Sequence, residues 1–142
     1  MGIDVVSGRI FYAAAAMGRK VRASALVASD GFSARYDLDR IRGTFSRPEH
    51  KLAGQSYHGR VLVLDAAKGG VATAWMLHEM TARGMAPAAL VLNAVNPIMA
   101  QGAALADFTM ISGFDADITQ VIPNGALVEV DPAGQRPCIR IV

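Results

Sequence analysis

The fold is decided by the stretch Arg60-Val-Leu-Val-Leu-Asp-Ala-Ala-Lys-Gly-Gly70, which continues as Val71-Ala-Thr-Ala-Trp-Met-Leu-His-Glu-Met-Thr-Ala-Arg83. Its first half is a nearly continuous apolar run of strand length, which predicts a strand buried on both faces. Its second half has helix-forming composition with apolar residues at helical spacing, and Gly84 stands where helices commonly end. We therefore expect a strand, a glycine turn and a helix in direct succession.

The next segments repeat this arrangement. Ala88-Ala-Leu-Val-Leu-Asn93 has the same buried-strand pattern, and Pro97 is well placed as the first residue of a second helix over 97–106. Together the four segments predict a βαβα unit. Further strands are expected at 5–12, 21–27, 108–111, 126–130 and 138–142, with an irregular stretch that contains Asp115, Asp117 and Pro123 between the strands at 108–111 and 126–130. The fold class is therefore α/β, in a single domain spanning residues 1–142.

Composition restricts the classes of function. The chain has 142 residues, of which 52% are hydrophobic and 18% charged, with a net charge of +2. Its cationic side chains are scattered along the chain, which argues against nucleic-acid binding. The N-terminus lacks the order of a signal peptide and no apolar run is long enough to cross a bilayer, so we expect a cytoplasmic protein without membrane contact. The apolar excess predicts a surface that a partner covers.

Metal binding within this chain is not expected. The single Cys138 cannot supply the several thiolates that an iron–sulfur cluster needs. His50, His58 and His78 are too far apart for a compact metal-ligand motif, and the pair His78-Glu79 lacks the second histidine of a helical zinc site.

The glycine turn is the strongest candidate for a binding site. Gly69 and Gly70 allow close approach of a ligand to the backbone, and the first helical amides that follow favour an anion. Lys68 adds a positive charge at the same place. The motif is not a nucleotide-binding phosphate loop, because the glycine spacing and the Lys-Ser/Thr ending are absent. The alternative is a tight turn with a solvated lysine.

Three other groups of polar residues are candidates. The charged segment 32–59, which includes His50, is long and weakly periodic, as functional segments often are. Asp115 and Asp117 are better interpreted as caps of backbone amides than as an acid/base pair. Asn96 fits an N-cap before Pro97, whereas Asn93 stands at the carboxyl end of a strand, where α/β sheets commonly bind ligands.

Several of these segments resemble the swivelling domain of the aconitase X family. The similarity rests on Gly59-Arg-Val-Leu-Val-Leu-Asp65, Trp75-Met-Leu-His-Glu-Met80, Arg83-Gly-Met-Ala-Pro-Ala-Ala-Leu-Val91 and Ile98-Met-Ala-Gln-Gly-Ala-Ala-Leu-Ala106. The Gly-x-Ala-Pro-x-Ala pattern after the helix is its most specific part. The resemblance spans nearly the whole chain and implies a β/β/α swivelling domain of the aconitase C-terminal, phosphohistidine-like type.

The resemblance also implies an activity. In this family a large subunit carries the iron–sulfur cluster and the small domain closes over the substrate. Members dehydrate mevalonate 5-phosphate or cis-3-hydroxy-L-proline. We therefore expect the small subunit of a heterodimeric hydro-lyase, acting on a small anionic hydroxy acid such as cis-3-hydroxy-L-proline. It would hold no cofactor of its own and would be inactive without the large subunit.

The glycine turn departs from the family pattern. There it usually reads Gly-Arg-Gly-Ser, and the serine is taken as the proton acceptor; here Lys68 stands in the place of the arginine and Gly70 in that of the serine. Lys68, with its pKa lowered on domain closure, or Thr73 could supply the missing base, or the large subunit could do so.

We expect substrate to contact the turn at Lys68, Gly69, Gly70 and Val71, and also Asn93. The alternative is a non-catalytic binding or regulatory module that lost the family serine and kept the fold.

Overall fold

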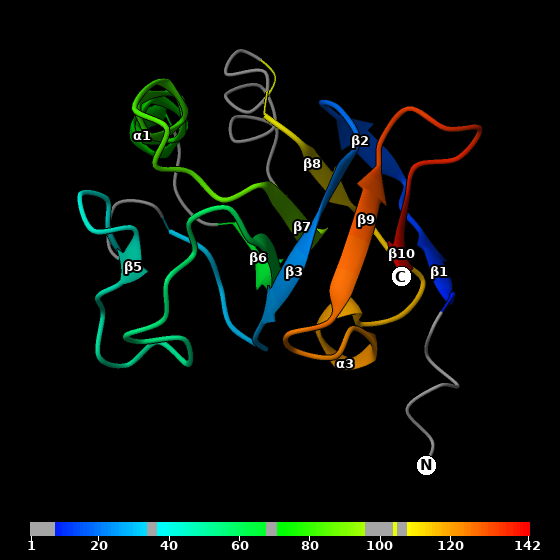
Figure 1. The fold of residues 1–142 in the computed structure, drawn as a ribbon, viewed down its shortest axis with the longest axis horizontal. Helices are drawn as coiled ribbons and strands as arrows, with labels where there is room; N and C mark the ends of the chain where they lie inside the picture. The colour runs from blue at the N-terminus through cyan, green and yellow to red at the C-terminus, as the bar shows by residue number, and fades with distance from the viewer. Residues whose placement is uncertain (1–7, 34–36, 68–70, 96–103, 105–107) are drawn as a thin grey trace.

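The computed structural model describes residues 8–33, 37–67, 71–95, 104 and 108–142 of the chain. A mixed sheet dominates it, with helix α1 (Val71–Ala82), the short helix α3 (Ile118–Val121) and an irregular lobe around the sheet (Figure 1). The glycine turn 68–70 lies outside the described residues, as does almost all of the helix expected over 97–106.

The described residues form an eight-stranded sheet in the order β1-β10-β9-β3-β6-β7-β8-β2. The strands are β1 (Ile10–Tyr12), β2 (Ala15–Met17), β3 (Val21–Val27), β6 (Val61–Ala66), β7 (Ala89–Ala94), β8 (Met110–Ser112), β9 (Leu127–Asp131) and β10 (Cys138–Ile141). Neighbouring strands β3, β6, β7 and β8 run parallel, and the remaining pairs are antiparallel. The expected parallel unit therefore forms half of a larger mixed sheet.

The sheet curls round on itself. Its two outermost strands, β1 and β2, are consecutive in the chain and separated only by Ala13 and Ala14. The amide of Ala13 still donates to Pro137 beside β10, whereas the amide of Ala14 donates to Ser112 in β8. One continuous segment thus joins both ends of the sheet, which protects its edges from pairing with other chains.

Successive side chains of each strand point to opposite faces of the sheet, and the buried ones form two separate cores. Small and β-branched side chains fill the inside of the curled sheet, and Ile118 and Ile122 of the α3 segment close one end of it. The strand residues of this inner core are Ala25, Val61, Val63, Ala89, Val91, Ile111, Val128, Val130, Ile139 and Ile141. Because these positions alternate with outward ones, every second residue of β6 and β7 faces the inner core.

Larger side chains form the outer core. Leu62 and Leu64 of β6 pack in the same cluster as Leu77 and Met80, so α1 covers the outer face of the parallel strands. Gly84 follows the helix with φ +71°, a conformation that glycine adopts without strain, which confirms the expected helix end.

The charged segment forms a lobe over residues 37–58, which also packs on the outer core. It contains the two-stranded ribbon of β4 (Leu38–Asp39) and β5 (Thr44–Phe45), and otherwise consists of turns. Its buried aromatic side chains, Phe45 and Tyr57, belong to the outer core cluster. The expectation of a long weakly periodic segment is confirmed, and apolar anchors hold it on the sheet.

Two features differ from the sequence expectations. Strand β2 was not expected, because Ala15–Met17 carries no alternation and pairs with β8 only through closure of the sheet. The irregular stretch before the terminal strands contains α3, which is too short for a helical period. Both elements depend on contacts with distant segments.

Candidate functional site

The carboxyl ends of β3, β6 and β7 bring polar side chains to one edge of the sheet. Ser29 and Asp30 follow β3, Asp65 is the penultimate residue of β6, and Asn93 is the penultimate residue of β7. The register pairs Leu64 with Leu92 and Ala66 with Ala94, which sets Asp65 beside Asn93. In α/β sheets this edge is where ligands commonly bind.

Asn93 is the centre of the arrangement. Its Nδ2 donates to Oδ1 of Asp65 at 3.0 Å and to Oδ1 of Asp117 at 2.8 Å. Its Oδ1 accepts the backbone amide of Ile118 at 2.9 Å. Both amide hydrogens and the amide oxygen are therefore engaged, and the side chain ties the ends of two strands to the start of α3.

Asp117 is the N-cap of α3, as expected. Its Oδ1 accepts the backbone amide of Thr119 at 3.0 Å and the Thr119 hydroxyl at 2.7 Å. Hydrogen bonds from the Thr119 side chain, then from Asn93, hold the pKa of Asp117 below its ordinary value. This carboxylate is stabilised in its charged form and is a weak proton acceptor.

Asp30 joins the strand edge to the lobe. Its Oδ1 accepts the amide of Gly31 at 2.8 Å, and its Oδ2 accepts the amide of Lys51 at 3.0 Å. Lys51 Nζ in turn donates to the carbonyl of Ser29 at 2.8 Å. Burial is the largest influence on the pKa of Asp30 and raises it, but the backbone amides of Lys51 and Gly31 and the charge of Arg47 outweigh burial and hold the pKa below its ordinary value.

His50 is buried where the lobe meets the chain that follows β3. Its side chain is 0% exposed and stacks on Phe45 with ring centroids 4.5 Å apart. Nε2 lies 2.8 Å from the Gly31 carbonyl and Nδ1 accepts the amide of Leu52 at 3.0 Å, which is the pattern of the Nε2–H tautomer. Both ring nitrogens are used, so His50 acts here as a structural link.

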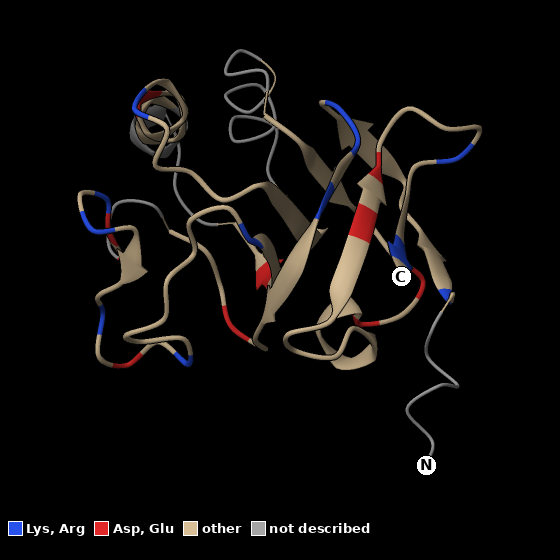
Figure 2. Ribbon diagram, viewed as in Figure 1, with Lys and Arg blue, Asp and Glu red and all other residues tan. Residues whose placement is uncertain are grey.

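The lobe also contributes cations. The Arg47 guanidinium pairs with Asp37 and lies 4.0 Å from Asp30, and the hydrogen bond to Asp37 raises its pKa. Figure 2 shows acidic positions at the tip of β6 and in the connections that follow β3 and β8, and both basic and acidic positions along the lobe. The described part of the edge is therefore acidic at its centre, and the lobe beside it has charges of both signs.

The structure locates the predicted site residues only in part. Lys68, Gly69 and Gly70 lie outside the described residues. Val71 is the first residue of α1 and Thr73 lies in its first turn, but their side chains are outside the description. Asn93 lies at the predicted edge, and its substrate contact stays a prediction.

Asp65 was not singled out from the sequence. Its side chain is exposed, and its backbone amide donates to the Asp30 carbonyl at 2.8 Å. A pattern that could have revealed it is the repeated ending of the two buried runs, Leu-Val-Leu-Asp65 and Leu-Val-Leu-Asn93. A polar residue in the same place at the end of two neighbouring parallel strands indicates a shared edge.

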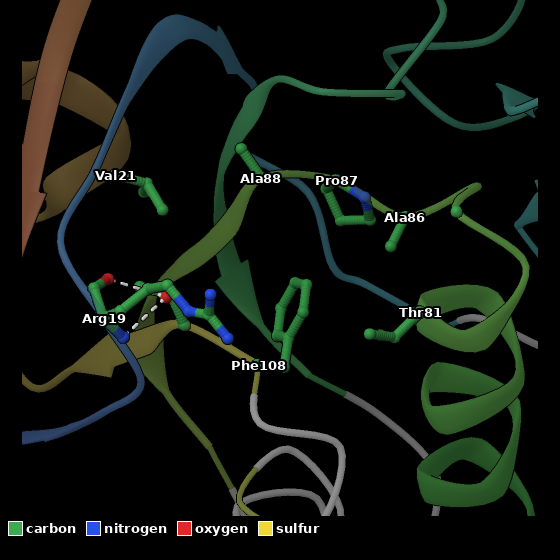
Figure 3. A pocket seen from close by; sticks show the side chains of 9 residues that line it. Arg19, Val21, Thr81, Ala86, Pro87, Ala88 and Phe108 are labelled. Carbon is green, nitrogen blue, oxygen red and sulfur yellow. Dashed lines mark hydrogen bonds between the residues drawn. The ribbon is translucent and has the colours of Figure 1, made fainter.

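A pocket of about 280 Å³ opens at the opposite ends of the strands (Figure 3). Val21, Ala88 and Phe108 give it apolar walls. Its hydroxyls are engaged: Thr109 exchanges hydrogen bonds with the backbone of Arg19, and Thr81 donates to the Leu77 carbonyl. This pocket offers little for chemistry compared with the carboxyl edge.

The described residues do not fit an iron–sulfur cluster. Cys138 lies in β10, and its burial, followed by the charge of Asp131, raises the pKa of its thiol and disfavours the thiolate that a cluster binds. Within the described ranges no three His, Cys, Asp or Glu side chains are grouped to hold a metal ion. No helix in those ranges has the length and apolar character needed to cross a bilayer.

A curled mixed sheet covered by helix α1 on its outer face defines a mixed α/β domain, and sequence comparison gives its family. The profile of the aconitase X swivel domain matches residues 10–140. This chain belongs to that family, which confirms the resemblance inferred from the sequence.

Individual relatives agree with this assignment. The phosphomevalonate dehydratase small subunit of Methanopyrus kandleri is 33% identical over 115 residues, covering 81% of this chain and 85% of the relative. The phosphomevalonate dehydratase small subunit of Methanocella arvoryzae is 29% identical, and the match covers 80% of this chain and 86% of the relative. The crystal structure of Thermococcus kodakaraensis aconitase X superposes with a TM-score of 0.85 at 24% identity, covering 95% of this chain and 99% of that one. The expected swivel-domain fold is thereby confirmed.

Proposed function

We propose that this chain is the small subunit of an aconitase X type dehydratase and works only together with a large subunit. The family match over residues 10–140 carries the proposal. The similar relatives bear the name of a dehydratase small subunit and are covered over most of their length. An iron–sulfur cluster, if the enzyme uses one, would be held by the large subunit.

Exposed apolar side chains support the need for a partner. Trp75 on α1 is 66% exposed and Ile41 at the tip of the lobe is 79% exposed. Large apolar and aromatic side chains of this kind are typical anchors of protein interfaces. The proposed large subunit would bury part of this surface when the two chains assemble.

The proposed substrate is a small hydroxy acid with an anionic group. The relatives named above make phosphomevalonate the first substrate to test, ahead of the cis-3-hydroxy-L-proline that we expected from the sequence. Lys68 and the amides that begin α1 are proposed to bind the anionic group, because a helix start favours negative charge. Helix α1 begins at Val71, a few residues after β6 ends at Ala66, which supports this assignment.

Reconstitution tests the proposed function. This chain would be expressed together with the aconitase-like large reading frame of the same genome, purified anaerobically and assayed for loss of water from each substrate. We expect a stable complex that dehydrates one of the two, while neither chain alone does so.

The outcomes separate the alternatives. A complex without dehydratase activity on either substrate would favour a binding or regulatory module that lost the family serine. Failure of the two chains to associate would contradict the subunit assignment itself. A stoichiometric iron–sulfur cluster on this chain alone would also contradict it, because one cysteine cannot supply the ligands.

A further inference from the structure

Loss of water from a hydroxy acid requires a group that removes a proton from carbon. The serine expected in the glycine turn is replaced by Gly70, which has no side chain to accept a proton. If the proposed function holds, the proton has to be accepted elsewhere: by Lys68, by Thr73, by the large subunit or by another side chain near this edge. The hydrogen bonds of the edge show which described groups are available.

Most of the polar groups there are already committed. Both oxygens of Asp30 accept backbone amides, and both nitrogens of His50 are bonded within the chain. Ser29 Oγ accepts a hydrogen bond from the side-chain Nε2 of Gln120, and both Nδ2 and Oδ1 of Asn93 are hydrogen-bonded. Taking a proton from a substrate would weaken the contacts through which each of these groups holds the edge together.

Asp65 differs from them. Its Oδ1 accepts one hydrogen bond from Asn93, and its Oδ2 takes part in no hydrogen bond with the described residues. The side chain is exposed, while its backbone is fixed by pairing with β7 and by the amide bond to Asp30. It is therefore an oriented carboxylate with an open oxygen, three residues before the glycine turn begins.

Two other carboxylates nearby are less suited. Asp117 accepts three hydrogen bonds at Oδ1, which stabilise its charge and weaken it as a base. Asp115 is exposed, and no neighbouring group in the described structure orients its carboxylate. A general base needs a fixed geometry as well as an available oxygen.

We propose that Asp65 is the proton acceptor of this subunit and that Asn93 is the residue that positions it. The inference rests on the proposed dehydratase function and names the base of that same site. The Asp65 carboxylate takes the proton from the substrate carbon that is bonded to the substrate's own carboxylate group. The electron pair of that C–H bond forms the C=C bond, and the C–O bond breaks to release hydroxide. The proton on Asp65 and the hydroxide together make up the water that is lost.

The substitution Asp65→Asn tests this role in the assembled complex. An asparagine has nearly the same shape and still offers an oxygen to Asn93 Nδ2, but it cannot accept a proton. We expect kcat to fall by about 10² or more with KM little changed, and the acid limb of the pH–rate profile to disappear. A purely structural role would leave kcat and the pH profile nearly unchanged.

Three further variants complete the experiment. Asp115→Asn removes an exposed carboxylate from the neighbouring connection and should leave kcat within about twofold of the wild type, in the range of ordinary surface changes. Asn93→Ala should lower kcat with KM little changed, since Asp65 loses the hydrogen bond that orients it. Lys68→Ala should mainly raise KM, as expected for a residue that binds the anion.

The results distinguish the inference from the function on which it rests. If the wild-type complex dehydrates its substrate and Asp65→Asn retains its kcat, Asp65 is not the base, although the dehydratase assignment holds. If Lys68→Ala or Asp115→Asn causes the large loss of kcat instead, the proton acceptor is that residue. An inactive wild-type complex overturns both proposals.

Discussion

At the scale of single residues, the carboxyl edge shows how one side chain organises several others. Asn93 bonds two carboxylates and a helix amide at distances of 2.8–3.0 Å. Two negative charges so close together are tolerated because the Asn93 and Thr119 donors stabilise one of them, Asp117. The edge therefore contains one carboxylate, Asp117, that accepts three hydrogen bonds and one, Asp65, that accepts a single hydrogen bond from the described residues.

The capping role of Asp117 predicts a pH-dependent stability. Because its folded pKa lies below the ordinary value, its contribution is present above the ordinary pKa and is lost as pH falls through the folded value. Asp117→Asn keeps a cap acceptor but cannot titrate, so its difference in free energy of unfolding from the wild type should shrink as the solution is acidified. Asp117→Ala should cost about 1 kcal/mol at neutral pH.

Urea unfolding at a series of pH values checks both statements. A difference between wild type and Asp117→Asn that stays constant down to strongly acidic pH would show that the charge of Asp117 contributes nothing.

At the scale of elements, the 37–58 lobe is held on the sheet by few but buried contacts. His50 is its central link, since it stacks on Phe45 and bonds the Gly31 carbonyl and the Leu52 amide. Removing the imidazole leaves a cavity and two unsatisfied backbone groups. The lobe should then open more easily than the sheet, because its own hydrogen bonds are mostly those of turns.

We expect His50→Ala to destabilise the protein by about 2–4 kcal/mol. Hydrogen exchange should show faster exchange of the lobe amides, such as Tyr57, whose amide donates to the Gly43 carbonyl. Amides between β6 and β7 should keep most of their protection. His58→Ala is the matched control, because His58 is exposed and bonds only the Gly84 carbonyl, so its cost should stay below about 1 kcal/mol.

At the scale of the whole molecule, closure of the sheet depends on the seam between β2 and β8. Gly18 follows β2 with φ +94°, and a Cβ there would collide with the backbone of Thr109, which precedes β8. Thr109 Oγ1 also accepts the Arg19 amide at 3.0 Å and donates to the Arg19 carbonyl at 2.7 Å. The seam therefore needs a glycine for both its conformation and its close approach.

Gly18→Ala should destabilise the protein more than Gly54→Ala does. Both glycines have positive φ, but nothing lies within 4 Å of a Cβ at Gly54, where φ is +83°. We expect Gly54→Ala to lower the free energy of unfolding by about 1 kcal/mol through backbone strain. Gly18→Ala should lower it by about 2–4 kcal/mol, because the collision of the Cβ with Thr109 adds to the strain. Thermal or urea unfolding measures both, and equal costs would show that the seam can adapt to a side chain.

The sequence by itself determined the parallel unit and its helix. The apolar runs that end at Asp65 and Asn93, the helical spacing after Gly70 and the glycine at position 84 are local patterns, and each fixes local structure through burial and backbone conformation. The family followed from the same segments. Asn93 was placed at the correct edge for the same reason, because the carboxyl ends of parallel strands must meet.

Only the tertiary structure decided which polar groups are left open. Asn93 is 28 residues from Asp65 and 24 from Asp117, and no local pattern shows that one amide holds both. His50 lies in a charged segment that the sequence marks as a candidate for function, whereas the fold uses both of its nitrogens to attach the lobe. The availability of a donor or acceptor depends on every neighbour that folding brings to it, so it becomes known only when the sheet has closed and the lobe is in place.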